Sequence, residues 1–154
     1  MLDYIVVSNG EEYRVAATLF KVYAEWLGID LGFQNFEDEL LSLQKMYRPP
    51  HGTIILCKDD HEFVACVAVR PIHDKIAELK RMYVKPNFQR KGIGEELLRL
   101  SLAFAKNAGY KKARLDTLNT MLPAMSLYKK NGFKEIPAYY YNPEPTAVYF
   151  EKSL

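Results

Sequence analysis

The residues of this sequence best suited to chemistry form the short stretch 89–94, which reads Gln-Arg-Lys-Gly-Ile-Gly. The apolar-rich run before it, residues 76–84, is typical of a strand and ends just before Pro86. A helical pattern follows over residues 95–108 and ends at Gly109. A strand, a basic loop with two glycines and a helix direct free backbone N–H groups and the positive end of a helix dipole to one point. The sequence therefore predicts an anion site, suited to a phosphate or diphosphate.

The two glycines of this stretch have a physical reason. A phosphate oxygen must come within about 3 Å of backbone nitrogens for good hydrogen bonds, and a Cβ at Gly92 or Gly94 would obstruct that approach. Arg90 and Lys91 add positive charge. The stretch is not a P-loop, because glutamates rather than Lys-Ser/Thr follow its last glycine, and it is not a dinucleotide fingerprint, because Leu97 replaces the third glycine.

Other patterns along the chain indicate the elements that position this loop. Strands are expected at residues 2–7, 53–58, 62–69, 76–84, 112–118, 133–136 and 147–151. Helices are expected at 11–27, at 36–47 with Asn35 as N-cap, and from Pro123 to Gly132. We predict a single α/β domain over residues 1–154, with a mixed, largely antiparallel sheet flanked by helices.

Composition narrows the class of protein further. The chain has 154 residues, of which 49% are apolar and 26% charged, so one domain with a real core is expected. The net charge of +2 is too small to indicate nucleic-acid binding. The N-terminal stretch has no long apolar run, so we expect no signal peptide, no membrane span and a cytoplasmic location.

Cysteine and histidine usage indicates neither export nor a metal site. Spacing alone allows a disulfide between Cys57 and Cys66, but reduced core residues are the favoured reading in a chain without export signals. The histidines, His51, His61 and His73, stand singly near turn signals and lack metal-ligand spacing, so surface positions and no metal are expected.

The loop, the strand before it and a second signature at residues 124–133, Ala-Met-Ser-Leu-Tyr-Lys-Lys-Asn-Gly-Phe, together resemble the GNAT superfamily of acyl-CoA N-acyltransferases. The resemblance runs from about residue 76 to 133. It implies that the strands before and after the long helix are parallel and splayed at one end, with an acyl-CoA in the splay. It also implies the cosubstrate acetyl-CoA and direct acetyl transfer to a small-molecule or peptide amine.

The resemblance assigns expected roles to particular residues. Gln89, Arg90, Lys91, Gly92, Ile93 and Gly94 would hold the diphosphate, and Met82, Tyr83 and Val84 would offer backbone groups to the pantetheine arm and the acetyl carbonyl. Tyr128 would lie near the sulfur and protonate the leaving thiolate. Many relatives carry an asparagine seven residues before this tyrosine, where this chain has Met121; Asn119 is a candidate substitute.

The base that deprotonates the amine is expected to be Glu78, which stands eleven residues before Gln89, the spacing of histone-type relatives. Two alternatives stay open: a surface ion pair of Glu78 with Lys80, and a proton relayed through water. A bulge in this strand would also upset the alternation on which the argument depends.

The acceptor site is expected between the first two helices and the last hairpin. Tyr139, Tyr140 and Tyr141 cannot all face one side of a strand, so some would line a cleft or pack beneath a helix, and Trp26 and Phe33 are candidates for the same cleft. An aromatic wall suits a flat or cationic amine. A non-catalytic acyl-CoA-binding module is the alternative function, and a homodimer is left open.

Overall fold

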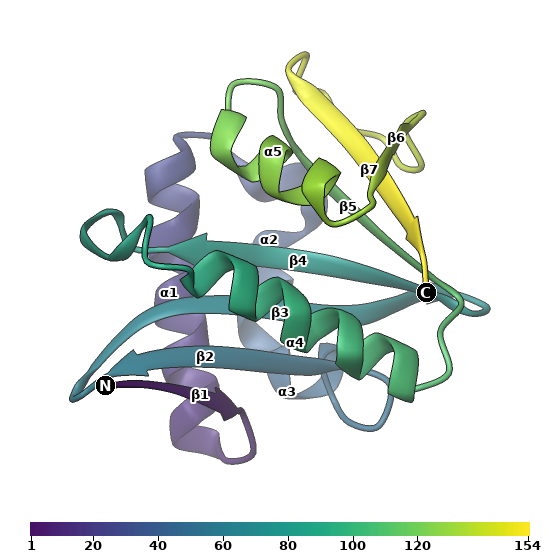
Figure 1. The fold of residues 1–154 in the computed structure, drawn as a ribbon. Helices are drawn as coiled ribbons and strands as arrows, with labels where there is room; N and C mark the ends of the chain where they lie inside the picture. Colours follow the sequence, from purple (N-terminus) through teal and green to yellow (C-terminus); the bar gives the residue numbers. More distant parts are fainter.

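The computed structural model describes residues 1–154, apart from the side chain of Phe33, and its strands form one seven-stranded sheet (Figure 1). The strands are β1 (Leu2–Val6), β2 (Thr53–Asp59), β3 (Glu62–His73), β4 (Ile76–Val84), β5 (Lys112–Leu118), β6 (Lys134–Ile136) and β7 (Ala147–Ser153). Their spatial order is β1-β2-β3-β4-β5-β7-β6, and every neighbouring pair is antiparallel except β4 and β5. The predicted mixed, largely antiparallel sheet is confirmed.

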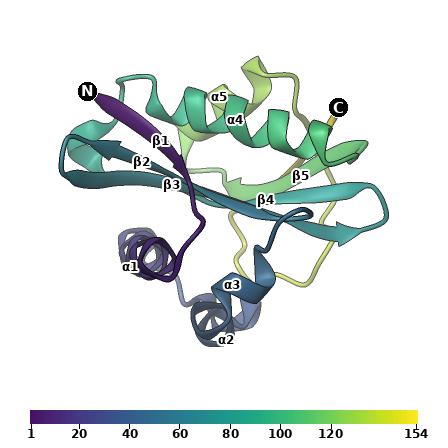
Figure 2. The same cartoon turned by 90° about the horizontal axis from the view of Figure 1, so that it is seen from below.

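Helices cover both faces of this sheet (Figure 2). The α-helices are α1 (Gly10–Leu27), α2 (Phe36–Leu41), α3 (Leu43–Met46), α4 (Ile93–Asn107) and α5 (Leu122–Lys130), with short 3-10 turns η1 (Leu31–Gln34) and η2 (Pro86–Phe88). Figure 2 shows α4 and α5 on one face and α1, α2 and α3 on the other. Buried apolar clusters lie on both sides of the sheet.

The long helix α4 lies within two residues of its predicted range, 95–108. Ile93, Leu97 and Ser101 are buried, as their spacing on one face requires, and Leu98 and Ala105 complete the buried stripe. Because this stripe packs against the middle of the sheet, the first turn of α4 is held at the end of β4.

The prediction of one continuous helix over residues 36–47 is wrong, because two short helices, α2 and α3, occupy this stretch. Ser42 departs from helical backbone angles (φ −134°, ψ 29°) and separates α2 from α3, while its Oγ donates to the carbonyl oxygen of Asp38. Asn35 is the N-cap residue of α2, as predicted, but it has φ +57° and its side chain makes no cap hydrogen bond. The break lets Glu39 and Tyr47 both turn inward, where their side chains hydrogen-bond each other at 3.1 Å.

Strand β3 is longer than its predicted end at residue 69. Beyond Val69, which pairs with the first residue of β2, it continues with β4 as its only neighbour. Pro71 is tolerated because it has a strand on one side only.

The two cysteines are free and buried. Cys57 belongs to the apolar cluster beneath α4, whereas Cys66 belongs to the cluster beneath α1, so the sheet separates them. The preferred reading of reduced core residues is confirmed.

Candidate active site

Strands β4 and β5 pair over a short length and then separate. Their parallel register includes Ile76↔Lys112, Ala77↔Ala113 and Glu78↔Arg114 and goes no further, although β4 continues to Val84 and β5 to Leu118. Backbone groups of β4 beyond residue 78 therefore face β5 without ladder partners on that side. The predicted splay between the two central parallel strands is confirmed.

A bulge in β4 lies within the splay. Lys80 pairs with Ala68 and Tyr83 with Cys66, so two residues of β4 oppose a single residue of β3. Arg81, one of the two, has φ +58°, a conformation that costs a non-glycine residue about 1–2 kcal/mol. Glu78 and Lys80 stay on one face, as the alternation predicts, because the bulge comes after them.

Buried polar contacts hold Arg81 in this conformation. Its Nε and Nη2 donate to the two carboxylate oxygens of Glu39 at 3.0 and 2.7 Å. The thiol of Cys66 lies with its Sγ 3.2 Å from the carbonyl oxygen of Arg81, and the Arg81 guanidinium lies over the ring of Phe36. Since Glu39 and Arg81 are each at most 6% exposed, this pair ties α2 to the bulge.

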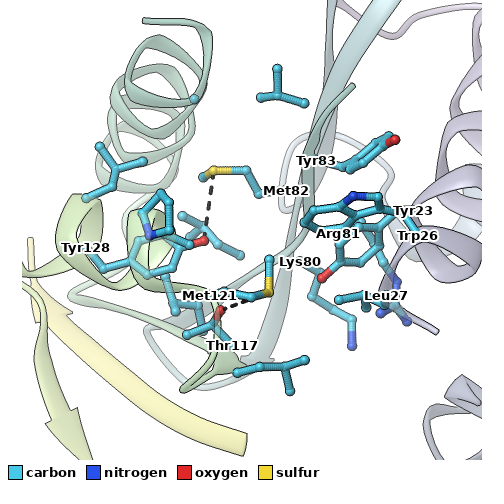
Figure 3. A pocket seen from close by; sticks show the side chains of 18 of the residues that line it. Tyr23, Trp26, Leu27, Lys80, Arg81, Met82, Tyr83, Thr117, Met121 and Tyr128 are labelled. Carbon is cyan, nitrogen blue, oxygen red and sulfur yellow. Dashed lines mark hydrogen bonds between the residues drawn. The ribbon is translucent and has the colours of Figure 1, made fainter. Parts of the chain in front are cut away.

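The main cavity occupies the splay and has a volume of about 560 Å³. It extends from the loop before α4, between β4 and β5, to the C-terminal end of α1, with α5 on its other side. Figure 3 shows Met82, Met121 and Tyr128 on the α5 side of this cavity, and Tyr23, Trp26 and Tyr83 on the α1 side.

The loop predicted to bind an anion opens into this cavity. Gln89, Arg90, Gly92, Ile93 and Gly94 line it, whereas the ammonium group of Lys91 lies over the ring of Phe88. Gly92 has φ +81° and a Cβ built on it would meet nothing within 4 Å, so the space in front of it is open. The first N–H groups of a helix lack intrahelical acceptors, and no side chain caps α4. The Gln89 side-chain amide instead donates to the carbonyl oxygen of Val84 and anchors the loop to β4.

Tyr128 lies in the middle of the cavity wall. Its hydroxyl is 4.0 Å from Sδ of Met82, and its ring packs edge-on against Phe133. Burial raises the pKa of Tyr128, so the phenol stays protonated at neutral pH. The structure thus places Tyr128 and Met82, two of the predicted site residues, beside each other in this cavity.

Aromatic rings form the opposite wall. The centroid of Trp26 lies 5.5 Å from that of Tyr83, and Tyr23 contacts both rings. Trp26 lines this cavity, whereas Tyr139 and Tyr140 line a separate, smaller one, so the expected cleft shared by Trp26 and these tyrosines is not found among the described residues. The side chain of Phe33 is outside the part of the chain that the structure describes. We call Tyr23, Trp26 and Tyr83 the aromatic wall.

Asn119 does not lie where a substitute for the asparagine missing at position 121 would be expected, whereas Met121 itself does line the cavity. Asn119 is exposed in the turn after β5, its backbone N–H donates to the carbonyl oxygen of Thr146, and it does not line the cavity. Met121 lines the cavity, with Sδ 3.7 Å from Oγ1 of Thr117.

Glu78 is 2% exposed and lies outside the main cavity. Its Oε1 accepts from Nε of Arg70 at 2.9 Å and is 3.8 Å from Nζ of Lys80, while Oε2 accepts from the hydroxyl of Tyr139 at 2.7 Å. It lines a second cavity of about 260 Å³. Burial alone would raise the pKa of Glu78, but Lys80, Arg70 and Tyr139 together hold it below the usual 4.5. The ion pair with Lys80 exists, although it is buried rather than on the surface.

Glu78→Gln is therefore expected to act mainly on stability. It leaves Arg70 and Lys80 without their full negative partner and should lower the free energy of unfolding at pH 7 by about 2–3 kcal/mol. Because the pKa of Glu78 is lowered, the stability it supplies is present above about pH 4.5 and is lost as pH falls through its folded value. Urea unfolding from pH 3 to 7 should show the deficit shrinking in acid. Glu62→Gln, which breaks the more exposed pair with Lys85, is the control, and an equal deficit in both would contradict this role.

The three consecutive tyrosines divide as predicted. The hydroxyl of Tyr139 donates a hydrogen bond to Glu78, and that of Tyr140 donates to Oδ2 of Asp116 at 2.8 Å, whereas Tyr141 is 78% exposed. Sequence reasoning missed Asp116, which lines the main cavity. The signal was available: Arg114 and Asp116 are charged positions in a strand expected to be covered on both faces.

Neither a metal cluster nor a membrane helix is found among the described residues. No three His, Cys, Asp or Glu side chains in this part of the chain gather closely enough to hold a metal ion. None of the described helices is both long enough and apolar enough to cross a membrane.

Several known proteins are similar to this chain in sequence or in fold. The acetyltransferase (GNAT) family matches residues 17–133. An uncharacterized N-acetyltransferase of Schizosaccharomyces pombe is 41% identical over 88% of this chain and 85% of its own length. One of Dictyostelium discoideum is 30% identical over 96% of each. The PaiA N-acetyltransferase of Thermoplasma acidophilum, solved in complex with coenzyme A, has a similar fold: TM-score 0.78, 21% identity, covering 100% of this chain and 99% of that one.

The splayed sheet and the loop before α4, together with these similarities, place the protein in the class of acyltransferases. The chain belongs to the acetyltransferase (GNAT) family, and it is an enzyme of acetyl transfer.

Proposed function

We propose that residues 1–154 form one cytoplasmic domain that transfers an acetyl group from acetyl-CoA directly to an amine held in the main cavity. The observation that carries the proposal is the continuity of this cavity from the loop before α4, between the splayed strands, to Tyr128 and the aromatic wall. The coenzyme A complex of the Thermoplasma neighbour supports the choice of donor.

The diphosphate of the donor would lie against the loop from Gln89 to Gly94. The open space at Gly92 admits a phosphate oxygen to the backbone, and the dipole of α4 favours its charge. Arg90, which also lines the cavity, supplies positive charge.

The pantetheine arm would run beside Met82, Tyr83 and Val84. Met82 is the second residue of the bulge, Tyr83 and Val84 follow it, and the backbone groups of all three toward β5 have no strand partner. A backbone N–H there can donate to the acetyl carbonyl and stabilise the negative charge that develops on its oxygen.

Tyr128 would then protonate the leaving sulfur. Tyr128→Phe is expected to lower kcat by about 100-fold, the typical contribution of a positioned proton donor, with little change in the Kd for CoA. Stopped-flow or steady-state thiol release and calorimetric CoA titration measure the two quantities. Tyr110→Phe is the matched control, because that tyrosine is also buried but donates to His51 outside the cavity. An unchanged kcat in Tyr128→Phe would remove this role.

The acceptor would be a small-molecule or peptide amine whose apolar body lies on the aromatic wall. Free-thiol release from acetyl-CoA, measured across a panel of alkyl, arylalkyl and peptide amines, tests the function. Amine-dependent release with a matching acetylated product is expected. Binding of CoA without release for any amine would instead favour an acyl-CoA-binding module.

A further inference from the structure

Asp116 occupies the part of the main cavity where an acceptor would meet the acetyl group. It stands on β5 two residues beyond Arg114, which belongs to the last β4–β5 pair, and it lines the cavity between the two walls. Burial is the main cause of the raised pKa of Tyr23 on the α1 side and of Tyr128 on the α5 side, and the negative charge of Asp116 raises both further. The carboxylate therefore acts electrostatically on both walls.

Hydrogen bonds orient the Asp116 carboxylate. Oδ2 accepts from the hydroxyl of Tyr140, and that hydroxyl also accepts from Nε2 of Gln34 at 2.9 Å and Nδ2 of Asn142 at 3.3 Å. Within the described part of the chain, hydrogen bonds to this carboxylate engage Oδ2 alone. Glu78 differs, because both of its oxygens are engaged and it opens into the smaller cavity.

Charged and titratable groups from several elements surround Asp116. They are Glu78, Lys80 and Arg81 of β4, Tyr139 and Tyr140 of the loop before β7, Tyr149 of β7, Tyr23 of α1 and Tyr128 of α5. Burial raises the pKa of Asp116 above its usual value, with opposition from Lys80 and the Tyr140 hydrogen bond. A carboxylate with a raised pKa is a stronger proton acceptor.

We propose that Asp116, rather than Glu78, takes the proton from the ammonium group of an amine whose aromatic body lies on the aromatic wall. The inference rests on the proposed function and names its base and acceptor class. One proton passes from nitrogen to the carboxylate. The freed nitrogen lone pair forms the C–N bond, the C–S bond breaks, and the thiolate takes a proton from Tyr128. The phenolate recovers its proton from the acylated nitrogen, and Asp116 returns its own to solvent.

The test compares two amines of the same shape: 2-phenylethylamine and its less basic 2,2-difluoro analogue, at saturating acetyl-CoA. Asp116→Asn keeps a hydrogen-bond acceptor for Tyr140 but cannot take a proton. It should lower kcat/KM for 2-phenylethylamine by about 100-fold and leave the Kd for CoA unchanged. The loss for the difluoro analogue should be markedly smaller, because more of that amine is already neutral. Asp74→Asn, an exposed aspartate in the turn after β3, is the control.

A second variant probes the same carboxylate without removing it. Tyr140→Phe deletes a hydrogen bond that lowers the pKa of Asp116, so the acid limb of the kcat/KM profile should move to higher pH. The inference is overturned if Asp116→Asn lowers kcat/KM equally for both amines, or if the acid limb of the profile does not move in Tyr140→Phe. It is also overturned if the amine-dependent loss of kcat/KM occurs in Glu78→Gln and not in Asp116→Asn. A wild-type enzyme that binds acetyl-CoA and acetylates neither amine would overturn it as well. Absence of acetyl-CoA binding would overturn the proposed function itself.

Discussion

Gly92→Asp is expected to raise the Kd for CoA by about 1,000-fold, which corresponds to about 4 kcal/mol. The new Cβ and carboxylate would lie in the open space at the start of α4, where they obstruct the approach of a phosphate to the backbone and repel its charge. Each charge-assisted hydrogen bond lost contributes about 1.5–3 kcal/mol, so losing two of them accounts for this effect. Calorimetric titration with CoA measures it.

The fold should survive this substitution. A Cβ at position 92 meets nothing within 4 Å; φ +81° strains an L side chain there by about 1–2 kcal/mol, but the negative charge of aspartate is favourable at the positive end of a helix dipole. Gly109→Asp is the matched control. It has φ +94°, it also has open space for a Cβ, and it lies at the far end of α4. If both variants bind CoA equally well, the loop is not the anion site.

Arg81→Met is expected to lower the free energy of unfolding by about 3–5 kcal/mol, the typical cost of leaving one partner of a buried ion pair uncompensated. Glu39 would remain buried with a single donor, the hydroxyl of Tyr47, among the described hydrogen bonds. The bulge at residue 81 would lose the contacts that offset its positive φ. Urea denaturation at neutral pH measures the loss.

The double variant Glu39→Leu/Arg81→Met separates the charge from the packing. Replacing both members of a buried pair by apolar residues of similar volume is often neutral, so most of the lost stability should return. If the free energy of unfolding of Arg81→Met alone lies within about 1 kcal/mol of the wild-type value, the pair does not hold α2 to the bulge.

The local sequence predicted the elements that build the proposed anion site because strand, loop and helix follow one another directly. Residues 76–109 contain β4, the glycines and α4, and each has its own periodicity or turn signal. The mixed, largely antiparallel sheet could be predicted for the same reason, because its strands have local sequence signals. The site's backbone could thus be predicted from a short range of sequence.

The parts that sequence reasoning missed depend on contacts between distant residues. The break at Ser42 follows no Gly or Pro, and it accompanies the inward turn of Glu39 toward Arg81, forty-two residues away. The position of Glu78 in a separate cavity depends on Arg70 and Tyr139. Asp116 is a charged position in β5, but its exposure to the cavity arises only because β4 leaves β5 before reaching it.

A crystal structure of the protein grown with CoA would decide the location of the donor. We expect the diphosphate oxygens within about 3 Å of the backbone nitrogens at the start of α4, with the sulfur between Met82 and Tyr128. A complex in which CoA lies elsewhere and the space before Gly92 holds only solvent would contradict the assignment of the cavity and of the residues that line it.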